Sequence, residues 1–524
     1  MKKTEINRFA QNDADRPARK ISSATKDCIA QSIQELFART ATRFPDREAV
    51  VDDQGSWSYR ELARQAELYA THFRSLTSDP FPRALILASQ SRETLAVALG
   101  ALLSGWSFAC IDNSYTESLI KGAIERIRPA AIVHTRNGPP MPTLSQTQSD
   151  MPVYITASDI PAQDHAPGWL DNHQPVPGGS RTEIAQITFT SGSTGFPKAV
   201  AIAHQDYVNL LERWIDLYDI VPEDRIAVQS TFMYDGFLDA LVAAAAGATA
   251  IIVPEGIYFD GDAWAKYLRG NRVTSLMAVP AAMQLALGSL SPTSLPPRLR
   301  RLILIGEACS AHIYRLIDRK LPRNLRIHNS FGISEALLIM DSVVDRSHPV
   351  ITTSFPPPDR ENVPWKLVDD DGADISQKIG ATGSLLVAPP GIFTGYVGDD
   401  GTVSSHQNDQ GYYDTRDLFR VLPDHSLKYL GRKDRRLKWA GYRIEPTEIE
   451  LAALSVPGVI AARCTITSSN DLQCEVTCDK TEGSMLVIDQ IKKAFTEFLP
   501  ISYSQEIRTI ETTVHILSEL KKLR

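Results

Sequence analysis

The stretch FTSGSTGFPKAV, residues 189–200, decides the fold of this chain. It places two Ser, two Thr and two Gly before a single Pro-Lys pair. A loop of this kind can turn several backbone amides and hydroxyls toward one set of phosphate oxygens. It does not follow the common nucleotide loop G-x-x-x-x-G-K-[ST], because Pro197 takes the place of a Gly. The apolar runs at residues 187–190 and 200–203 predict a strand on either side, and therefore a hairpin-like phosphate clamp rather than a flexible Ser/Gly linker.

Strand and helix patterns alternate along the chain on both sides of this loop. Residues 84–89 and 108–112 have the pattern of buried strands, and residues 91–105 between them carry a helical pattern. After the loop, a helical pattern at residues 207–218 precedes another strand at residues 226–230. Such alternation predicts an α/β fold with a parallel sheet and crossover helices.

The length and composition restrict the kind of protein. A chain of 524 residues is too long for one ordinary core, so we expect at least two domains. A hydrophobic content of 43% and a charged content of 22% are typical of a soluble globular protein. The net charge is −7 and no basic stretch is present to neutralise phosphates, which argues against a nucleic-acid partner.

The sequence also argues against a membrane protein. The N-terminal residues are charged and no apolar core follows them, which fits neither a signal peptide nor an anchor. The most apolar run, residues 240–253, is too short to span a bilayer, and Gly247 interrupts it. It predicts the end of a helix followed by a buried strand. The six Cys are scattered and fit reduced thiols, so we expect a cytoplasmic protein.

The segment TSGSTGFPKA resembles the signature loop of the adenylate-forming enzymes, and the chain is most similar to the stand-alone amino-acid adenylation domains of nonribosomal peptide synthetases. The resemblance extends from about residue 28 to residue 524. It implies a large N-terminal domain with mixed and parallel sheets at residues 28–432, after a flexible tail at residues 1–27. A small, mobile α+β domain would follow at residues 433–524, where the composition turns basic, with Asp434 as the hinge.

The reaction that the resemblance implies is attack of a carboxylate on the α-phosphate of ATP, which needs a pyrophosphate cradle and a metal ion. NSFGISEA, residues 329–336, resembles the family motif in which an aromatic-Gly pair precedes a Glu that binds magnesium, and this assigns the metal to Glu335. A hard cation prefers carboxylate and phosphate oxygens, so one Glu suffices when ATP brings the rest. Phe331 replaces the usual Tyr of this motif. The cradle is assigned to Thr190, Ser191, Gly192, Ser193, Thr194, Gly195 and Lys198.

Two further motifs would hold the nucleoside. IGEACS, residues 305–310, resembles the adenine-side motif of the family. YYDTRDL, residues 412–418, resembles its ribose-binding motif, in which Asp417 accepts hydrogen bonds from ribose hydroxyls and Arg416 occupies the position of a customary Gly. Arg432 would be a second ribose contact. The remaining nucleotide contacts that the resemblance implies are Gly306, Glu307, Ala308, Asn329, Ser330, Phe331, Gly332, Ile333 and Ser334.

The catalytic Lys of the family stands near the C-terminus in a P-x-T-x-x-G-K motif, which is absent here. Residues 437–450 do resemble the motif that swings into the active site for the thiol-transfer step. Counted from Leu499-Pro500, which resembles a family landmark, the position of the Lys falls on Lys521, with Lys522 as the alternative. The resemblance thus implies a catalytic set of Lys521, Glu335 and Thr190.

FMYDGFLDAL, residues 232–241, bears on the substrate. In amino-acid-activating members an Asp of this motif pairs with the substrate ammonium, and it falls on Asp235. A carboxylate at the pocket mouth suits an amino acid and not a fatty acid, although an Asp here can also cap the following helix. For Asp239 two interpretations stay open, contact with a second polar group of the substrate or a side chain that points away. By the same resemblance the pocket wall consists of Gly236, Asp239, Met277, Ile303, Ile305, Ser330, Leu338 and Ile339.

These resemblances predict an enzyme that uses ATP and Mg²⁺ to activate an amino acid and then loads it on the phosphopantetheine thiol of a separate carrier protein. An acid-CoA ligase shares every nucleotide motif and is the first alternative, against which Asp235 argues. A nucleotide-binding relative that has lost catalysis is the second alternative, because the C-terminal Lys motif is absent.

Overall fold

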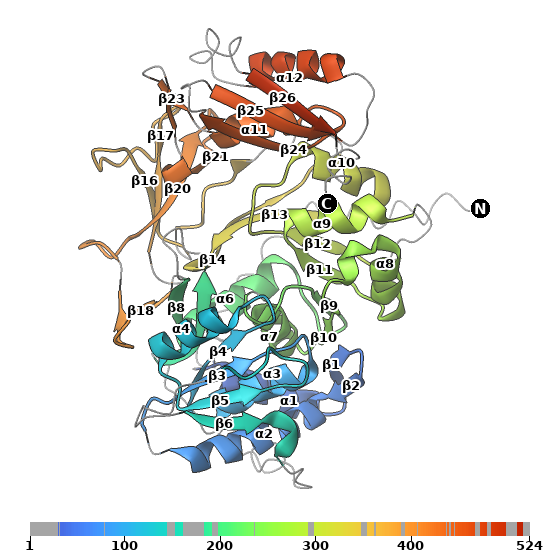
Figure 1. Cartoon of the computed structure of the whole chain (residues 1–524), viewed down its shortest axis with the longest axis vertical. Helices are drawn as coiled ribbons and strands as arrows, with labels where there is room; N and C mark the ends of the chain where they lie inside the picture. The colour runs from blue at the N-terminus through green and yellow to red at the C-terminus, as the bar shows by residue number, and fades with distance from the viewer. Residues whose placement is uncertain are drawn as a thin grey trace, which may run out of the picture.

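Two eight-stranded sheets form the larger part of the molecule (Figure 1). The structure is a computed structural model. It describes residues 30, 32–77, 79–143, 152–160, 183–190, 197–234, 236–291, 298–346, 354–360, 363–388, 393–405, 407–435, 437–439, 442–444, 446–466, 472–478, 484–498 and 511–516.

The first sheet is mixed, with six parallel inner strands and one antiparallel strand at each edge. In spatial order its strands are β14 (Ala336–Val343), β13 (Arg326–Ile333), β12 (Arg301–Leu304), β11 (Ser275–Ala278), β9 (Arg225–Val228), β10 (Thr249–Ile252), β1 (Glu48–Asp52) and β2 (Gly55–Ser58). The inner strands β9, β10, β11 and β12 are almost wholly buried, as expected of parallel strands that helices cover.

The second sheet has five parallel strands and an antiparallel extension that begins at the phosphate-loop hairpin. In spatial order its strands are β19 (Val403–Ser404), β18 (Gly395–Val397), β8 (Lys198–Ala203), β7 (Ile184–Thr190), β4 (Ser107–Ile111), β3 (Arg83–Leu87), β5 (Ala131–His134) and β6 (Val153–Thr156).

Helices fill the space between the two sheets and cover their outer faces. One apolar cluster contains residues of both sheets together with α1 (Ile33–Arg43), α2 (Tyr59–Leu76), α3 (Arg92–Leu103), α6 (His204–Leu217) and α7 (Gly236–Ala246). A second cluster packs α8 (Gly261–Gly270), α9 (Pro280–Ser289) and α10 (Ala311–Lys320) on the first sheet, and a third packs α4 (Glu117–Ile127) on the second. Short 3-10 turns occur at Ala157–Asp159, Ile257–Phe259 and Lys433–Arg435.

Local sequence signals set the ends of these helices. Ser58 and Glu61 form a capping box at the start of α2, which satisfies backbone amides that no helical carbonyl can reach. Gly247 ends α7 in the left-handed region, at φ 73°, and a Cβ there would lie 2.7 Å from the Phe44 ring. The predicted helix, Gly stop and buried strand at residues 240–253 are therefore confirmed.

A five-stranded antiparallel sheet packs beside the edge of the first sheet, because β14 contributes to its apolar core. In spatial order its strands are β15 (Ser354–Phe355), β21 (Leu427–Arg432), β20 (Tyr413–Val421), β17 (Thr382–Val387) and β16 (Trp365–Val368). The alternation of strand and helix did not predict this sheet, because its strands are joined to one another without intervening helices.

A small C-terminal region has an apolar core of its own, from Ile449 to Ala494. It lies at the upper end of the molecule, coloured orange to red in Figure 1. Its three-stranded sheet consists of β24 (Val459–Ile466), β25 (Leu472–Cys478) and β26 (Glu511–Ile516), with helices α11 (Pro446–Leu454) and α12 (Ser484–Phe498), after a hairpin of β22 (Leu437–Trp439) and β23 (Tyr442–Ile444). The predicted fold class, a large α/β domain followed by a small α+β domain, is confirmed.

Candidate active site

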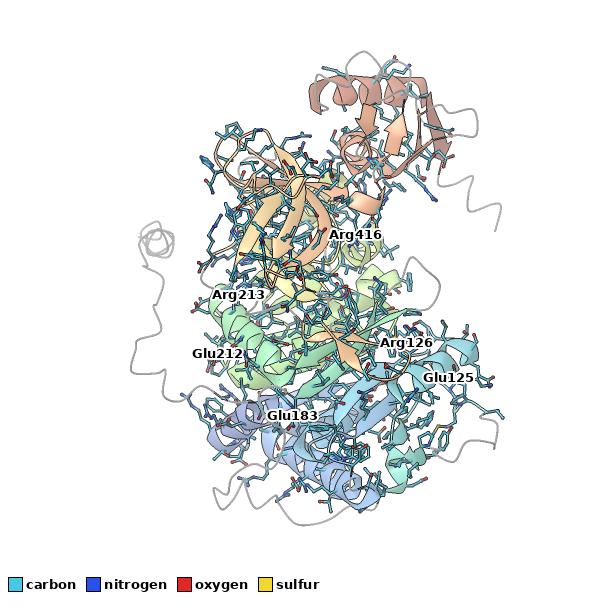
Figure 2. All side chains as sticks on the ribbon, turned by 90° about the vertical axis from the view of Figure 1, so that its left-hand side faces the viewer. Glu125, Arg126, Glu183, Glu212, Arg213 and Arg416 are labelled. Carbon is cyan, nitrogen blue, oxygen red and sulfur yellow. The ribbon has the colours of Figure 1, made fainter. Side chains whose placement is uncertain are left out.

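The phosphate loop joins two antiparallel strands. β7 ends at Thr190 and β8 begins at Lys198, and these two residues face each other across the strand pair. The predicted hairpin-like strands are confirmed, whereas Ser191, Gly192, Ser193, Thr194 and Gly195 lie outside the described residues. Arg126 of α4, which is labelled in Figure 2, donates to the Pro197 carbonyl at 2.9 Å and pairs with Asp399 at 2.6 Å. A cation from outside the motif therefore fixes the end of the loop.

Glu335 lies in the two-residue turn between β13 and β14. Its carboxylate oxygen Oε1 accepts a hydrogen bond from the Tyr396 hydroxyl at 2.5 Å. Its backbone carbonyl accepts from the Phe393 amide at 2.8 Å. Both contacts tie the tip of this hairpin to the segment that leads into β18.

Lys198 reaches the same tyrosine from the phosphate loop. Its ammonium nitrogen is 5.4 Å from the centroid of the Tyr396 ring, a cation–π distance. The Tyr413 hydroxyl is 3.0 Å from the Tyr396 hydroxyl. Burial, followed by the charge of Glu335, raises the pKa of Tyr396 well above its usual range, so this hydroxyl keeps its proton. The structure thus brings Lys198 and Glu335, two predicted site residues, to one side chain.

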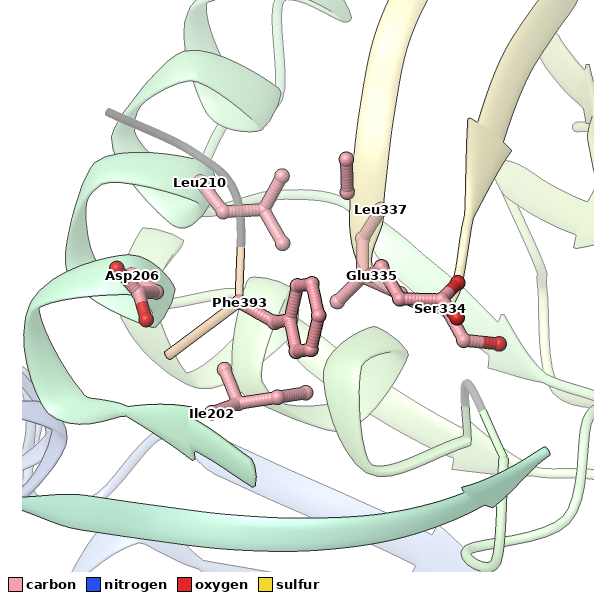
Figure 3. Close-up of a pocket in the computed structure, with 8 residues that line it drawn as sticks. Ile202, Asp206, Leu210, Ser334, Glu335, Leu337 and Phe393 are labelled. Atoms are coloured by element: carbon pink, nitrogen blue, oxygen red, sulfur yellow. The ribbon is translucent and has the colours of Figure 1, made fainter. Parts of the chain in front are cut away.

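A small pocket borders Glu335 on the side of α6 (Figure 3). Asp206, from the first turn of α6, also lines it. Burial raises the pKa of Asp206 to about 6, although hydrogen bonds from the Ala203 amide and the Thr394 hydroxyl oppose the shift. Asp206 therefore holds the start of α6 against β18. The lining residues are Ile202, Asp206, Leu210, Ser334, Glu335, Ala336, Leu337 and Phe393.

Asp417 and Arg432 face each other on the paired strands β20 and β21. The Arg432 Nη1 atom is 3.8 Å from Asp417 Oδ2, and the Tyr429 hydroxyl donates to Asp417 Oδ1 at 3.2 Å. Burial raises the pKa of Asp417 to about 7, against the charge of Arg432. Within the described part of the chain, the buried Oδ2 atom accepts no hydrogen bond. This acceptor fits a nucleotide that brings its own hydroxyl donors.

Arg416 adopts the backbone conformation for which the family uses Gly. Its φ is 60°, in the left-handed region, and its amide donates to Asp414 Oδ1 at 2.8 Å. The pairing of β17 with β20 shifts register at this point, as in a β-bulge. The loop before Asp417 therefore keeps a glycine-like conformation although the side chain is an exposed arginine.

β13 carries the predicted nucleotide-binding residues Asn329, Ser330, Phe331, Gly332 and Ile333, with Ser334 in the turn. The Phe331 ring lies 5.1 Å from Phe419 and 5.7 Å from Tyr429, so the same aromatic cluster that touches Asp417 supports it. Ser330 donates to Asp341 at 2.6 Å and contacts the Tyr218 hydroxyl at 2.8 Å. The Ser330 hydroxyl is thus already hydrogen-bonded to other side chains of the protein.

The segment from Gly306 to Ala308 follows β12. Gly306 has a φ of 98°, and a Cβ there would approach Val279 at 3.1 Å. Glu307 Oε1 accepts from the Ala281 amide at 2.5 Å, at the start of α9. A carboxylate at a helix N-terminus is favourable because the first amides lack helical acceptors. Glu307 therefore fixes this turn against α9.

The predicted pocket wall divides between two apolar clusters. Met277 and Ile303 are paired across β11 and β12, and they share one buried cluster with Ile305 and Leu338. Ile339 lies in the other cluster, against the five-stranded sheet, because consecutive strand residues face opposite sides. Gly236 and Asp239 lie in the first turn of α7 and are buried, and Asp235 lies outside the described residues.

Several residues that sequence reasoning missed hold the site together. Tyr396 and Tyr413 surround Glu335, and Arg126 holds the end of the phosphate loop. Arg213 donates to the carbonyls of Leu338 at 2.5 Å and Ile339 at 3.0 Å. In the sequence, Tyr396 could have been noticed because it follows Gly395 in a short apolar segment before β19. The arginines gave none, because their partners are distant backbone carbonyls.

The sequence profile of the AMP-binding enzyme family matches residues 37–397. This range contains Lys198, Glu335 and Tyr396, which the structure brings together. The chain belongs to the AMP-binding enzyme family.

Curated relatives of this AMP-binding enzyme are much longer proteins. It is 28% identical over 447 residues to tyrocidine synthase 3 of Brevibacillus parabrevis, covering 83% of this chain and 7% of the relative. It is 28% identical over 491 residues to phenyloxazoline synthase MbtB of Mycobacterium tuberculosis (strain ATCC 25618 / H37Rv), covering 90% of this chain and 32% of the relative. The chain therefore spans a third or less of these relatives.

Solved structures share the fold over nearly the whole chain. A four-domain nonribosomal peptide synthetase bound to AMP and glycine has a TM-score of 0.73 at 19% identity, covering 93% of this chain and 35% of that one. The anthranilate CoA ligase AuaEII in complex with anthranoyl-AMP has a TM-score of 0.77 at 15% identity, covering 94% of both chains. The AMP-binding enzyme is thus an adenylate-forming ligase related to nonribosomal peptide synthetase adenylation domains. Such enzymes use ATP.

None of the helices in the described segments has the length and apolar character needed to cross a bilayer. Among the same residues no group of three or more His, Cys, Asp or Glu side chains could hold a metal ion. A magnesium ion would thus rely on Glu335 together with phosphate oxygens, which fits the preference of this ion for oxygen ligands brought partly by substrate.

Proposed function

We propose that this AMP-binding enzyme activates an amino acid as its aminoacyl-adenylate with ATP and Mg²⁺, and then loads it on the phosphopantetheine thiol of a carrier protein acting in trans. The observation that carries the proposal is that Lys198 and Glu335, which belong to separate motifs, both contact Tyr396. We place the reaction in the cytoplasm, where the free, buried cysteines of the described segments would stay reduced.

In the first step a carboxylate oxygen of the substrate forms a bond to the α-phosphorus of ATP. The bond from that phosphorus to the bridging oxygen of the β-phosphate breaks, and pyrophosphate leaves with the electron pair. Lys198 and the cradle from Thr190 to Gly195 would stabilise the charge on the leaving group. Glu335 would hold Mg²⁺, which supplies positive charge at the phosphate oxygens when bound. Asp417 and Arg432 would bind the ribose.

Selection of an amino acid is assigned to Asp235, which lies outside the described residues and would pair with the substrate ammonium. The side chain of the substrate would enter between Gly236 and the apolar residues Met277, Ile303 and Leu338. Support comes from the shared buried cluster of these three residues and from the peptide-synthetase relatives.

The second step is assigned to a rotation of residues 433–524 about Asp434. Support comes from the separate apolar core of this region and from the exposed position of Asp434. The carrier thiol would attack the carbonyl carbon of the adenylate, AMP would leave, and the thiol proton would pass to solvent. Lys521, or Lys522 as the alternative, would serve the adenylation step; both lie outside the described residues.

Amino-acid-dependent exchange of labelled pyrophosphate into ATP tests the proposal, across α- and β-amino acids, aryl acids and fatty acids. Exchange with an amino acid, followed by transfer of its label to a phosphopantetheinylated carrier protein, is the expected result. Exchange only with simple carboxylic acids would contradict the role of Asp235 and favour an acid-CoA ligase. Failure of exchange with every acid, although ATP binds, would favour a non-catalytic nucleotide-binding protein.

A further inference from the structure

Tyr396 is the point at which two separate parts of the site meet. It lies 61 residues after Glu335, yet its hydroxyl donates to Glu335 Oε1 at 2.5 Å. Its ring centroid lies 5.4 Å from the Lys198 ammonium nitrogen. One side chain therefore contacts the carboxylate proposed to bind the metal and the cation proposed to bind pyrophosphate.

We propose that Tyr396 is a positioning residue for magnesium-bound ATP, which holds the Glu335 carboxylate and the Lys198 ammonium in a fixed relation. The inference rests on the proposed function, because it takes Glu335 as the metal-binding residue. It assigns no reacting atom to Tyr396, which acts through its two neighbours.

The surroundings of Tyr396 fix its position. It lies on β18, where it faces Val200 of β8, and β8 begins at Lys198. Its ring packs against the Phe393 ring at 4.9 Å. Its hydroxyl also lies 3.0 Å from the Tyr413 hydroxyl, and either hydroxyl can be the donor of that contact. Rotation of the Tyr396 side chain away from this position would break its hydrogen bond to Glu335 and lose the contact with Tyr413.

The hydroxyl of Tyr396 contacts Glu335, whereas its ring contacts Lys198, so the two contacts can be removed separately. A hydrogen bond to one oxygen of a carboxylate restricts rotation of the whole group, and thereby sets the direction of its second oxygen. Mg²⁺ demands near-ideal octahedral geometry, so it is sensitive to that direction. The ring alone faces Lys198 and fills the buried cluster. Replacement of Tyr396 by Phe therefore removes the hydrogen bond to Glu335 and keeps the packing of the ring.

The test is a titration of ATP binding with Mg²⁺, measured by calorimetry on the full chain. Tyr396→Phe should raise the Mg²⁺ concentration for half-maximal ATP binding by about tenfold, as expected for loss of a hydrogen bond to a charged group. Tyr413→Phe removes a hydroxyl that lies 3.0 Å from the Tyr396 hydroxyl and also interacts with Glu335, and it should raise this concentration by about threefold. Both variants should bind ATP within about twofold of the parent at saturating Mg²⁺, because the nucleoside contacts are unchanged.

Tyr267→Phe is the matched control. The Tyr267 hydroxyl also makes one hydrogen bond, to the Ile252 carbonyl at 2.7 Å, but on α8 and with no contact to the site. The control should keep the Mg²⁺ dependence of the parent. The inference fails if Tyr396→Phe and Tyr267→Phe have the same Mg²⁺ dependence, or if ATP binding by the parent does not respond to Mg²⁺. Because binding is the readout, a parent that binds magnesium-ATP but adenylates no amino acid would overturn only the proposed function.

Discussion

The hairpin around Glu335 and the small C-terminal region are attached to the two large sheets in different ways. The hairpin is held by side chains that share buried clusters with both sheets, and Glu335 itself is held by Tyr396 and Phe393. Among the described residues, the apolar core of the C-terminal region contains side chains of that region alone. Arg315 and Gln284 of the large part donate hydrogen bonds to its backbone carbonyls, and its helix α11 also packs beside β21.

From this difference we propose a fixed half of the site, around Glu335, and a half that can move, the C-terminal region. Arg315 of α10 donates to the carbonyls of Ser455 at 2.8 Å, Leu454 at 3.2 Å and Val456 at 3.3 Å, at the end of α11. A cation suits a helix C-terminus, where the last carbonyls lack helical donors. Such hydrogen bonds can break while the apolar core of the C-terminal region stays intact, because among the described residues that core belongs to this region alone.

Among the variants considered, Glu335→Gln should have the largest effect, and the effect should be on activity. Loss of the carboxylate charge should lower amino-acid-dependent pyrophosphate exchange by about 100-fold or more, because the Mg²⁺ that Glu335 is proposed to hold would no longer stabilise the charge on the α-phosphate and the leaving pyrophosphate. Exchange kinetics at saturating ATP measure this. Glu125→Gln, an exposed change on α4, should match the parent, and an equal loss in that control would contradict a specific role for Glu335.

Arg315→Ala should loosen the attachment of the C-terminal region to the large part of the molecule. We expect proteolytic cleavage between residues 433 and 445 to accelerate by about tenfold, since three hydrogen bonds from a charged group are lost. Pyrophosphate exchange should change by less than about threefold, because the fixed half is intact. Arg319→Ala, one turn further along α10, serves as the control. Equal cleavage rates for both variants would remove Arg315 from this role.

The affinity for ATP should depend on pH because Asp417 titrates. Asp417 must be ionised to accept hydrogen bonds with both oxygens, and burial raises its pKa to about 7. As the pH falls from 8 to 6 the carboxyl gains a proton, so the affinity for ATP should fall by about fivefold. Calorimetry at each pH measures this. Asp417→Asn should bind more weakly and show no such pH dependence, and a persisting dependence would assign it to another group.

Arg416→Gly should have the smallest effect, on stability alone. The left-handed backbone at φ 60° strains an arginine and not a glycine, so the free energy of unfolding should rise by about 0.5 to 1 kcal/mol. Arg326→Gly, an exposed position in the regular strand β13, should lower it by about 0.5 to 1 kcal/mol. Urea unfolding of both variants gives the comparison. A loss of stability in Arg416→Gly would contradict the strain.

The sequence predicted those parts of the molecule that local patterns determine. Strand and helix alternation placed β3, α3 and β4, and the apolar runs around the phosphate loop placed β7 and β8. The contact of Glu335 with Tyr396 could not be predicted, because 61 residues and several strands separate the two. The same holds for Arg126 and Pro197, which are 71 residues apart. The roles given to individual site residues by resemblance stay predictions.

The central claim is that an amino acid is joined to AMP in this site. A single-turnover reaction, with enzyme and ATP in excess over each acid and with mass-spectrometric detection of the acyl-adenylate, tests it most directly. The account predicts an aminoacyl-adenylate with at least one amino acid, formed by the parent and lost in Glu335→Gln. An adenylate that forms only with acids lacking an amino group, or that Glu335→Gln makes as fast as the parent, would contradict it.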